Sequence, residues 1–167
     1  MSSSFCANSP TAAPKAPPKL QAFLTSKGSL TALLEAHAHQ ALRVVVLHEG
    51  HALLNQHQKR LLSLPVHKPQ LAWIRTVKLY GNSDDAWVMA TSIFPLPTLT
   101  GVLKRLRHLG RTPIGYVLFK GHRTLPHVRH YYDENSCHGR RTVYEYHGKK
   151  LLIDERFLPA FIDSLSA

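Results

Sequence analysis

The segment RRTVYEYHGKKLLIDERF, residues 140–157, is typical of a β-hairpin, because two strand-like runs flank the turn residues His147 and Gly148. In the second run, every other side chain falls on the same face of the strand. That face consists of Leu151, Ile153, Glu155 and Phe157. It is apolar except for Glu155, and burying a carboxylate costs free energy unless a hydrogen bond or an opposite charge compensates it. Glu155 is therefore the first candidate for a functional residue.

Four other segments favour strands. They are RVVVLHEG (43–50), QLAWIRTVKLYG (70–81), AWVMATSIF (86–94) and, with a weaker pattern, TLPHVRHYYDE (124–134). Gly50 followed by HALLNQ predicts a return strand after the first of them. Helical patterns fill the intervals, with a start at Leu20, a cap at Ser29 or Thr31, an amphipathic run 99–106 that ends at Gly110, and a short helix PIGYVLF (113–119). This order indicates a single α+β domain with a mostly antiparallel sheet and flanking helices.

The first 19 residues are rich in Ser, Ala and Pro and predict a flexible tail, so we expect the folded domain to span residues 20–167. No apolar run approaches the roughly 20 residues that cross a bilayer, and the N-terminus has no pattern of a secretory signal. Two cysteines, Cys6 and Cys137, are too few for a disulfide framework. We therefore predict a cytoplasmic protein with free thiols and no membrane insertion.

The formal net charge of +11 suits an anionic partner such as nucleic acid, acidic lipid or a small polyanionic metabolite. On the hairpin, two basic pairs flank two tyrosines. These are Arg140-Arg141, Lys149-Lys150, Tyr144 and Tyr146. Interleaved basic and aromatic side chains can grip a single strand of nucleic acid. An exposed hairpin with cross-strand pairs explains the same pattern, and we prefer it.

A second charged residue interrupts an apolar strand face. It is Arg75, which shares the predicted face of Trp73, Val77 and Leu79. A guanidinium in an apolar pocket binds a carboxylate bidentately, and a desolvated carboxylate can exchange protons near neutral pH. Taken singly, Arg75 and Glu155 fit structural roles, including a pair with each other. Taken together, they indicate a binding site with catalytic potential.

The histidines do not predict a metal site. His48-Glu49-Gly50-His51 resembles a zinc motif, but its spacing is one residue short of the i, i+4 arrangement on a helix. His127 and His130 point to opposite faces of a predicted strand. The sequence also has no Gly-rich phosphate loop and no signature of a cysteine nucleophile.

Several short segments resemble one known family. HGRRTVYEYHGKKLLIDERFLP (138–159) resembles the C-terminal signature of bacterial chorismate lyases, in which a Gly-Arg-Arg hairpin leads to Glu-x-Phe-Leu-Pro. LGRTPIG (109–115) is similar to the family's Leu-Gly-x-Thr-Pro-Leu-Gly segment, and AWIR (72–75) is similar to its Trp-Leu-Arg strand. SLT (29–31) and HEG (48–50) match weaker points. The segments occur in the family's order over about residues 20–160, and this ordered combination makes the resemblance specific.

The resemblance implies conversion of chorismate to 4-hydroxybenzoate and pyruvate, the first committed step of ubiquinone biosynthesis. It also implies a monomeric enzyme without a cofactor, and helical flaps over an internal ligand site. Carried over to this sequence, Arg75 holds a ligand carboxylate and Glu155 faces the ring hydroxyl. Leu30 and Ile114 contact the ligand from the flaps, partly through main-chain groups.

Two positions depart from the family pattern. Thr91, on the same predicted face as Ile93, stands where relatives have a second anion-binding arginine, and His48 stands where many have arginine. We count Thr91 among the expected substrate-binding residues. Arg140, Arg141 and the histidines are the candidates to compensate for the missing guanidinium.

Two alternative functions stay open. One is a non-catalytic domain of the same fold that binds a small aromatic acid, because the lyase fold resembles effector-sensing domains of transcription regulators. The other is a basic nucleic-acid-binding protein, which predicts salt-sensitive binding to generic oligonucleotides. The lyase interpretation expects no nucleic-acid partner, and release of pyruvate from chorismate separates it from both alternatives.

Overall fold

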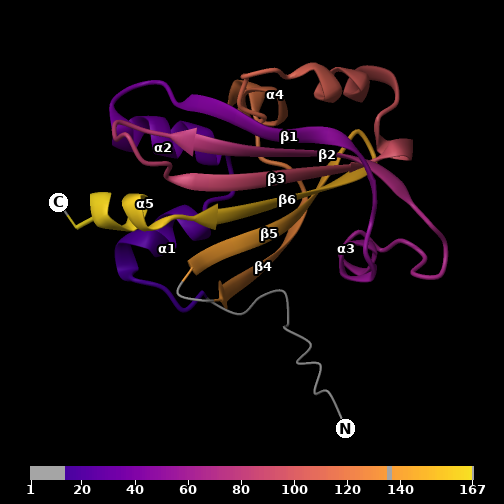
Figure 1. Cartoon of the computed structure of the whole chain (residues 1–167), viewed down its shortest axis with the longest axis horizontal. Helices are drawn as coiled ribbons and strands as arrows, with labels where there is room; N and C mark the ends of the chain where they lie inside the picture. Colours follow the sequence, from indigo (N-terminus) through magenta and orange to yellow (C-terminus); the bar gives the residue numbers. More distant parts are fainter. Residues whose placement is uncertain (1–13, 135–136, 167) are drawn as a thin grey trace, which may run out of the picture.

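A six-stranded sheet forms the centre of the molecule in a computed structural model that describes residues 14–134 and 137–166 (Figure 1). Its spatial order is β1-β2-β3-β6-β5-β4, and every neighbouring pair is antiparallel. The strands are β1 (Arg43–Leu53), β2 (Leu71–Tyr80), β3 (Val88–Pro95), β4 (His127–Glu134), β5 (Cys137–Tyr146) and β6 (Lys149–Phe157). The predicted α+β class and antiparallel sheet are confirmed.

The predicted hairpin joins β5 to β6. Its turn residues His147 and Gly148 have φ values of 49° and 70°, which place both in the left-handed region. Two consecutive positive φ values match the right-handed twist of the flanking strands, which is why such turns close two-residue hairpins. The register set by this turn places Arg140 directly opposite Glu155.

The predicted return strand after Gly50 is wrong. β1 continues through Gly50, which pairs with Ile74, as far as the pair Leu53–Leu71. The long β2 offers hydrogen-bonding partners on both sides of Gly50. The irregularity in this part of β1 is a bulge between Val46 and His48, and no turn interrupts the strand at Gly50.

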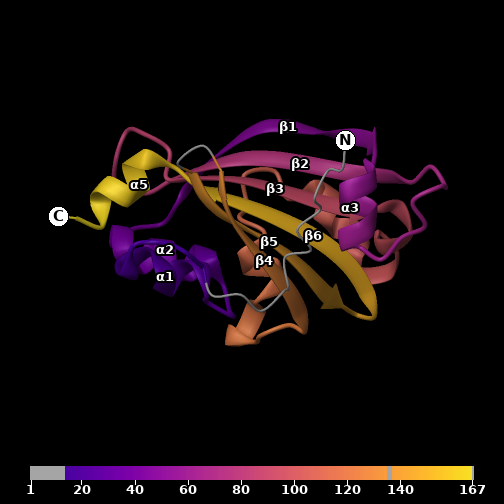
Figure 2. The ribbon, with the colours of Figure 1, turned by 90° about the horizontal axis from the view of Figure 1, so that it is seen from below.

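The helical segments occupy both faces of the sheet. They are α1 (Pro18–Leu24), α2 (Leu30–Ala38), α3 (Gln56–Leu61), η1 (Leu96–Thr98), η2 (Gly101–His108), α4 (Gly115–Leu118), η3 (Lys120–His122) and α5 (Pro159–Ser164). Figure 2 shows α1 and α2 together on one side of the sheet. The Ser29 hydroxyl accepts a hydrogen bond from Ala32 N, so the predicted cap is confirmed. The amphipathic run before Gly110 forms a 3-10 helix, and α4 begins at Gly115, after the predicted start.

Apolar side chains divide the interior into three clusters. One packs α1, α2 and α5 on the sheet, and a second packs η1, η2 and α4 on the same face. The third lies under α3 on the opposite face. Of the predicted tail, residues 1–13 lie outside the described residues, and α1 begins slightly before Leu20.

Gly81, after β2, lies against the indole of Trp87. A methyl group added at Gly81 would lie 2.3 Å from Trp87 Cζ3, and Trp87 is fully buried. We expect Gly81→Ala to lower the free energy of unfolding by about 1–3 kcal/mol, because an overpacked core must shift a rigid ring. Urea denaturation measures this, with Gly28→Ala as the control because nothing lies within 4 Å of its added methyl. Equal stability of the two variants would contradict the clash.

Candidate active site

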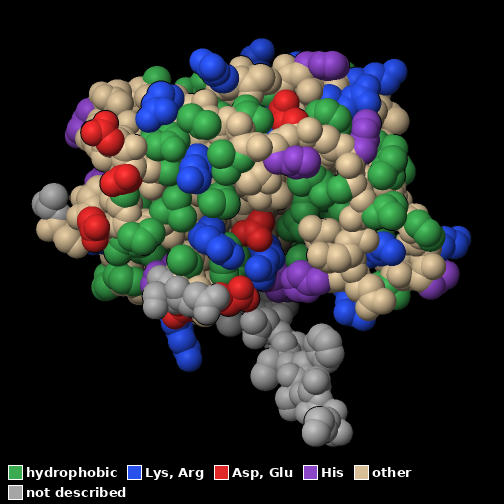
Figure 3. All heavy atoms as spheres, in the orientation of Figure 1, with side chains coloured by type: hydrophobic (Ala, Val, Ile, Leu, Met, Phe, Trp, Pro, Cys, Tyr) green, Lys and Arg blue, Asp and Glu red, His purple; other side chains and the backbone are tan. Residues whose placement is uncertain are grey.

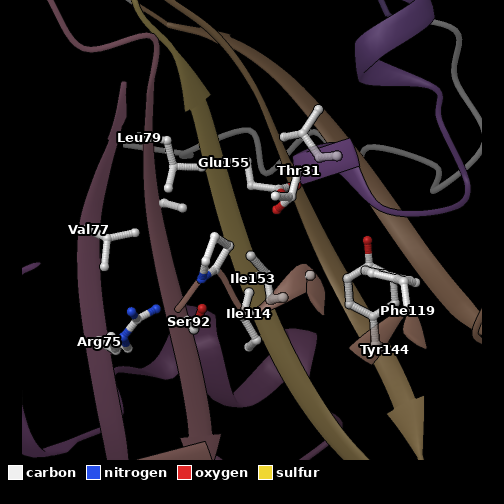
Figure 4. Close-up of a pocket in the computed structure, with 14 residues that line it drawn as sticks. Thr31, Arg75, Val77, Leu79, Ser92, Ile114, Phe119, Tyr144, Ile153 and Glu155 are labelled. Atoms are coloured by element: carbon white, nitrogen blue, oxygen red, sulfur yellow. The ribbon is translucent and has the colours of Figure 1, made fainter. Parts of the chain in front are cut away.

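A small, partly enclosed cavity of about 30 Å³ lies between the sheet and the segments α2 and α4. Its polar lining includes Arg75 on β2, Ser92 on β3 and Glu155 on β6, and its apolar lining includes Leu30 and Ile114. Figure 4 shows Arg75 and Ser92 toward one end of the group of side chains and Glu155 with Thr31 toward the other. The cavity therefore presents one cation and one anion on separate parts of its wall.

Arg75 is held in place by the protein before any ligand binds. Its side chain is 1% exposed, its Nε donates to Glu49 Oε1 at 3.1 Å, and its Nη2 donates to the carbonyls of Gly110 at 2.7 Å and Thr112 at 3.2 Å. Burial lowers the pKa of Arg75 below its ordinary value, and the charge of Glu49 offsets only part of this shift. The guanidinium is thus an under-compensated cation, which favours binding of a further anion.

Glu155 is paired with a different arginine. Arg140 Nε donates to Glu155 Oε2 at 2.6 Å, and the Arg140 side chain has no exposed surface. The possibility that Arg75 and Glu155 simply pair with each other is therefore wrong, because each has its own partner. Glu155 Oε2 is used by Arg140, so Oε1 is the oxygen better placed to meet a ligand in the cavity.

Tyr144 adds a hydroxyl to the cavity wall. Its oxygen accepts a hydrogen bond from Arg129 Nη2 at 3.0 Å, which leaves its own proton for another acceptor. Burial, and then the nearby charge of Glu155, raise the pKa of Tyr144 above its ordinary value. The phenol therefore stays protonated at neutral pH and can donate to a ligand.

Thr91, expected among the substrate-binding residues, does not line this cavity. Its Oγ1 lies 3.2 Å from Thr76 Oγ1, on the face of the sheet opposite Arg75. Strand alternation instead turns Ala90 and Ser92 toward the cavity. His48, the other departure, is exposed on β1.

The hairpin does not offer a nucleic-acid platform. Tyr144 and Tyr146 are 1% and 4% exposed, and Arg140 is buried with them, so these side chains cannot stack on bases. Arg141 lies on the other face, where it pairs with Asp154 at 3.1 Å and lies over the ring of Tyr132. Figure 3 shows Lys and Arg side chains scattered over this view of the surface, with acidic side chains among them.

Two flap segments meet over the cavity. A methyl group added at Gly115 would lie 2.7 Å from Thr31 Oγ1 and 2.8 Å from Ser29 Oγ, so only glycine permits this approach of α4 to α2. The Tyr116 hydroxyl also donates to the Glu35 carboxylate, which joins the same two helices. This bond, with smaller effects of burial and of the Glu35 charge, raises the pKa of Tyr116 to about 12.

Of the five predicted site residues, the structure brings four to one cavity: Arg75, Glu155, Leu30 and Ile114. The prediction did not include Ser92 or Tyr144, and it named Arg140 only as a possible substitute for an arginine. Period-two alternation along β5 places Arg140 and Tyr144 on one face and was the available signal. The basic pairs of the hairpin instead favoured an exposed surface.

Comparisons with known proteins identify the family of this chain. Residues 7–165 match the family model for chorismate lyase. A probable chorismate pyruvate-lyase of Psychrobacter arcticus is 48% identical over 87% of this chain and 89% of its own length. A chorismate pyruvate-lyase of Escherichia coli O1:K1 / APEC is 29% identical over 90% of this chain and 88% of its own length.

The fold is shared with solved structures of much lower sequence identity. The effector domain of PhnF from Mycobacterium smegmatis is similar with a TM-score of 0.52, at 10% identity over 81% of this chain and 91% of that one. A GntR-family regulator from Bacillus cereus also has a TM-score of 0.52, at 12% identity over 71% of this chain and 92% of that one. No helix in the described part of the chain is long and apolar enough to cross a membrane. The family match and the close relatives together show that this chain belongs to the chorismate lyase family.

Proposed function

We propose that the protein converts chorismate to 4-hydroxybenzoate and pyruvate, the first committed step of ubiquinone biosynthesis. In this reaction the ether bond between the ring and the enolpyruvyl group breaks, and the hydroxyl-bearing ring carbon loses a proton. Enolpyruvate then gains a proton at its methylene carbon. Atoms and electrons balance without an oxidant, so the reaction requires only that the protein bind the substrate and assist proton transfer. The observation that carries the proposal is a fixed cation and a fixed anion in one partly enclosed cavity.

Arg75 would hold one carboxylate of the dianionic substrate. Its Nε and Nη2 are occupied by Glu49 and by two carbonyls, so Nη1 is the nitrogen that would meet the ligand. Because the protein bonds fix the guanidinium in advance, binding costs little ordering of this side chain. The hydroxyls of Ser92 and Tyr144 would bind part of the substrate that a second arginine binds in relatives, since both residues line the cavity.

Glu155 would hydrogen-bond the ring hydroxyl and assist the transfer of the proton that the ring loses as it becomes aromatic. The enolpyruvyl ether is a good leaving group and aromatisation provides driving force, so the protein must mainly orient the substrate and assist proton movement. A carboxylate in an enclosed site performs both tasks better than one in water, because its hydrogen bonds face little competition from solvent.

Substrate entry requires the flaps to separate. The cavity of about 30 Å³ has room for only a few water molecules at most, far less than a substrate of ten carbon atoms needs. Leu30 and Ile114, at the cavity edges of the two flaps, would close on the ring after it enters. The cavity thus represents the closed form of the site.

We expect Tyr116→Phe to speed dissociation of 4-hydroxybenzoate about fivefold, because it removes a hydrogen bond to a carboxylate that holds the closed flaps together. Stopped-flow fluorescence measures the dissociation rate. Tyr80→Phe is the matched control, since Tyr80 lies under Arg43, away from the flaps. An unchanged rate in Tyr116→Phe would show that this bond does not hold the site closed.

Purified protein incubated with chorismate tests the proposed function. We expect pyruvate and 4-hydroxybenzoate to appear in equal amounts, measured by a coupled pyruvate assay and by ultraviolet absorbance. Tight binding of 4-hydroxybenzoate without pyruvate release would instead support a ligand-binding domain. The similarity of the fold to a GntR-family regulator and to an effector domain favours this second candidate. We extend the proposal to a monomer that acts in the cytoplasm, with residues 20–167 as its folded domain.

A further inference from the structure

Arg140 lies directly behind Glu155 and does not line the cavity. Its side chain has no exposed surface, and it stands opposite Glu155 across the β5–β6 pair. Burial acts to lower the pKa of Arg140, but the charge of Glu155, followed by smaller effects of Tyr144 and Tyr131, leaves it above its ordinary value. The guanidinium is therefore a permanent positive charge within the protein interior.

Each nitrogen of this guanidinium has a distinct environment. Nε donates to Glu155 Oε2 at 2.6 Å. Nη1 donates to the C-terminal end of α1 and the turn after it, with distances of 2.9 Å to Phe23 O, 3.0 Å to Leu24 O and 3.2 Å to Ser26 O. Nη2 is buried and has no hydrogen-bond partner within the described residues. Arg140 thus connects the carboxylate of the site to the chain segment 23–26.

The unpartnered Nη2 argues against a purely structural reason for arginine at this position. Buried donors are normally satisfied, and a buried ion pair seldom contributes more to stability than a well-packed apolar pair of similar volume. A sequence under selection for stability alone would therefore not favour an arginine with an unsatisfied nitrogen here. An arginine at this position is explained if the guanidinium orients the neighbouring carboxylate.

We propose that Arg140 is a positioning residue for the lyase reaction: it fixes Glu155 through Oε2 and so presents Oε1 to the substrate. This inference rests on the proposed function and adds a residue that acts through Glu155 without touching substrate. Fixing a reacting group in advance accelerates a reaction most where little solvent is present to reorganise, as in this cavity.

A second buried arginine supports the same arrangement. Arg129 Nη1 donates to Leu24 O at 3.2 Å and to Ser26 O at 2.6 Å, while its Nη2 donates to the hydroxyl of Tyr144. The two arginines therefore share the carbonyls of one turn, and each reaches a residue of the cavity wall. Segment 23–26 leads into the flap that begins at Ser29, so the position of Glu155 is tied to the base of that flap.

A double-mutant cycle tests the proposal. The variants are Arg140→Met, Glu155→Gln and their combination, each assayed for pyruvate release over a range of pH. We expect Arg140→Met to lower kcat roughly 30-fold or more and to move the acidic limb of the pH–rate profile to higher pH, because a carboxylate without its cation takes up a proton more readily. In the Glu155→Gln background the same change should lower kcat less than about threefold, since coupled residues are not additive.

Arg141→Met is the matched control. Arg141 is the next residue on β5 and also stands opposite an acid, Asp154, but on the other face of the sheet. We expect its kcat and pH profile to stay within about twofold of the wild type. Arg140→Lys retains the charge but not the fork that bonds Oε2 and the turn together, so it should recover only part of the activity.

Several outcomes would overturn the inference. An equal loss of kcat from Arg140→Met in both backgrounds would show that Arg140 does not act through Glu155, and normal kcat with a lowered melting temperature would show a structural role only. If Arg140→Met does not fold, Arg140→Lys decides: full activity and an unmoved pH profile would exclude positioning by the fork.

If the wild type releases no pyruvate, the proposed function fails, and the variants are compared by titration with 4-hydroxybenzoate. Arg140→Met should then weaken binding about tenfold relative to Arg141→Met, and equal affinities would reject the inference.

Discussion

Glu155→Gln is expected to lower kcat about 100-fold or more, because glutamine keeps the shape of the side chain but removes the charge that assists proton movement. The amide oxygen can still accept the hydrogen bond that Arg140 Nε now gives to Oε2. The fold should therefore persist, with a lower melting temperature than the wild type, because the buried Arg140 keeps its hydrogen bond but loses its counter-charge. Steady-state release of pyruvate measures the effect on kcat.

Asp154→Asn is the matched control for this change. Asp154 is the preceding residue on β6 and accepts hydrogen bonds from Tyr132 and Arg141. It lies on the face of the sheet opposite the cavity. We expect its kcat to remain near that of the wild type. Near-normal turnover in Glu155→Gln would remove Glu155 from the chemistry and leave it only as the partner of Arg140.

Arg75→Met is expected to raise KM for chorismate about 100-fold, because truncating one partner of a buried charge-assisted contact costs about 2–5 kcal/mol. The change also frees the Gly110 and Thr112 carbonyls and releases Glu49, whose side chain is 28% exposed and can turn to water. We therefore expect a modest fall in melting temperature together with the loss of binding. Initial rates over a range of chorismate concentrations measure KM.

The control for Arg75→Met is Arg111→Met, in the loop that Arg75 anchors. Arg111 is exposed, so its loss removes a positive charge near the site without removing a ligand contact. We expect KM to change less than about threefold in this control, since exposed charges are screened. Similar KM values in the two variants would mean that general positive potential, and not a fixed guanidinium, binds the substrate.

Much of the fold and part of the site follow from local patterns. Alternation on β2 and β6 placed Arg75 and Glu155 on apolar faces, and the structure confirms both placements. The turn at His147-Gly148 was predictable because only a few residue types adopt two successive positive φ values. These features depend on residues close together in the chain.

The errors arose where distant segments decide. Gly50 is compatible with a turn or a strand, and the length of β2 settles it. Thr91 was assigned to the site through the resemblance, but its face depends on how β3 pairs with β2 and β6. The partners of Arg140 are carbonyls more than 100 residues earlier in the chain, which no local pattern specifies.

The pairing of β3 with β6 also has a consequence for biosynthesis. This ladder begins at the pair Val88–Phe157, and among the strands of the described residues it is the ladder that joins β1-β2-β3 to β6-β5-β4. The sheet can therefore form only after β6 has been synthesised. The carbonyls of Leu24 and Ser26 likewise form their hydrogen bonds to Arg140 and Arg129 only after β4 and β5 have been synthesised. Folding dominated by such distant pairings is slow, and the incomplete chain exposes strand edges to other molecules. A nascent polypeptide that stops short of its last strand has every flap residue and no enclosed site.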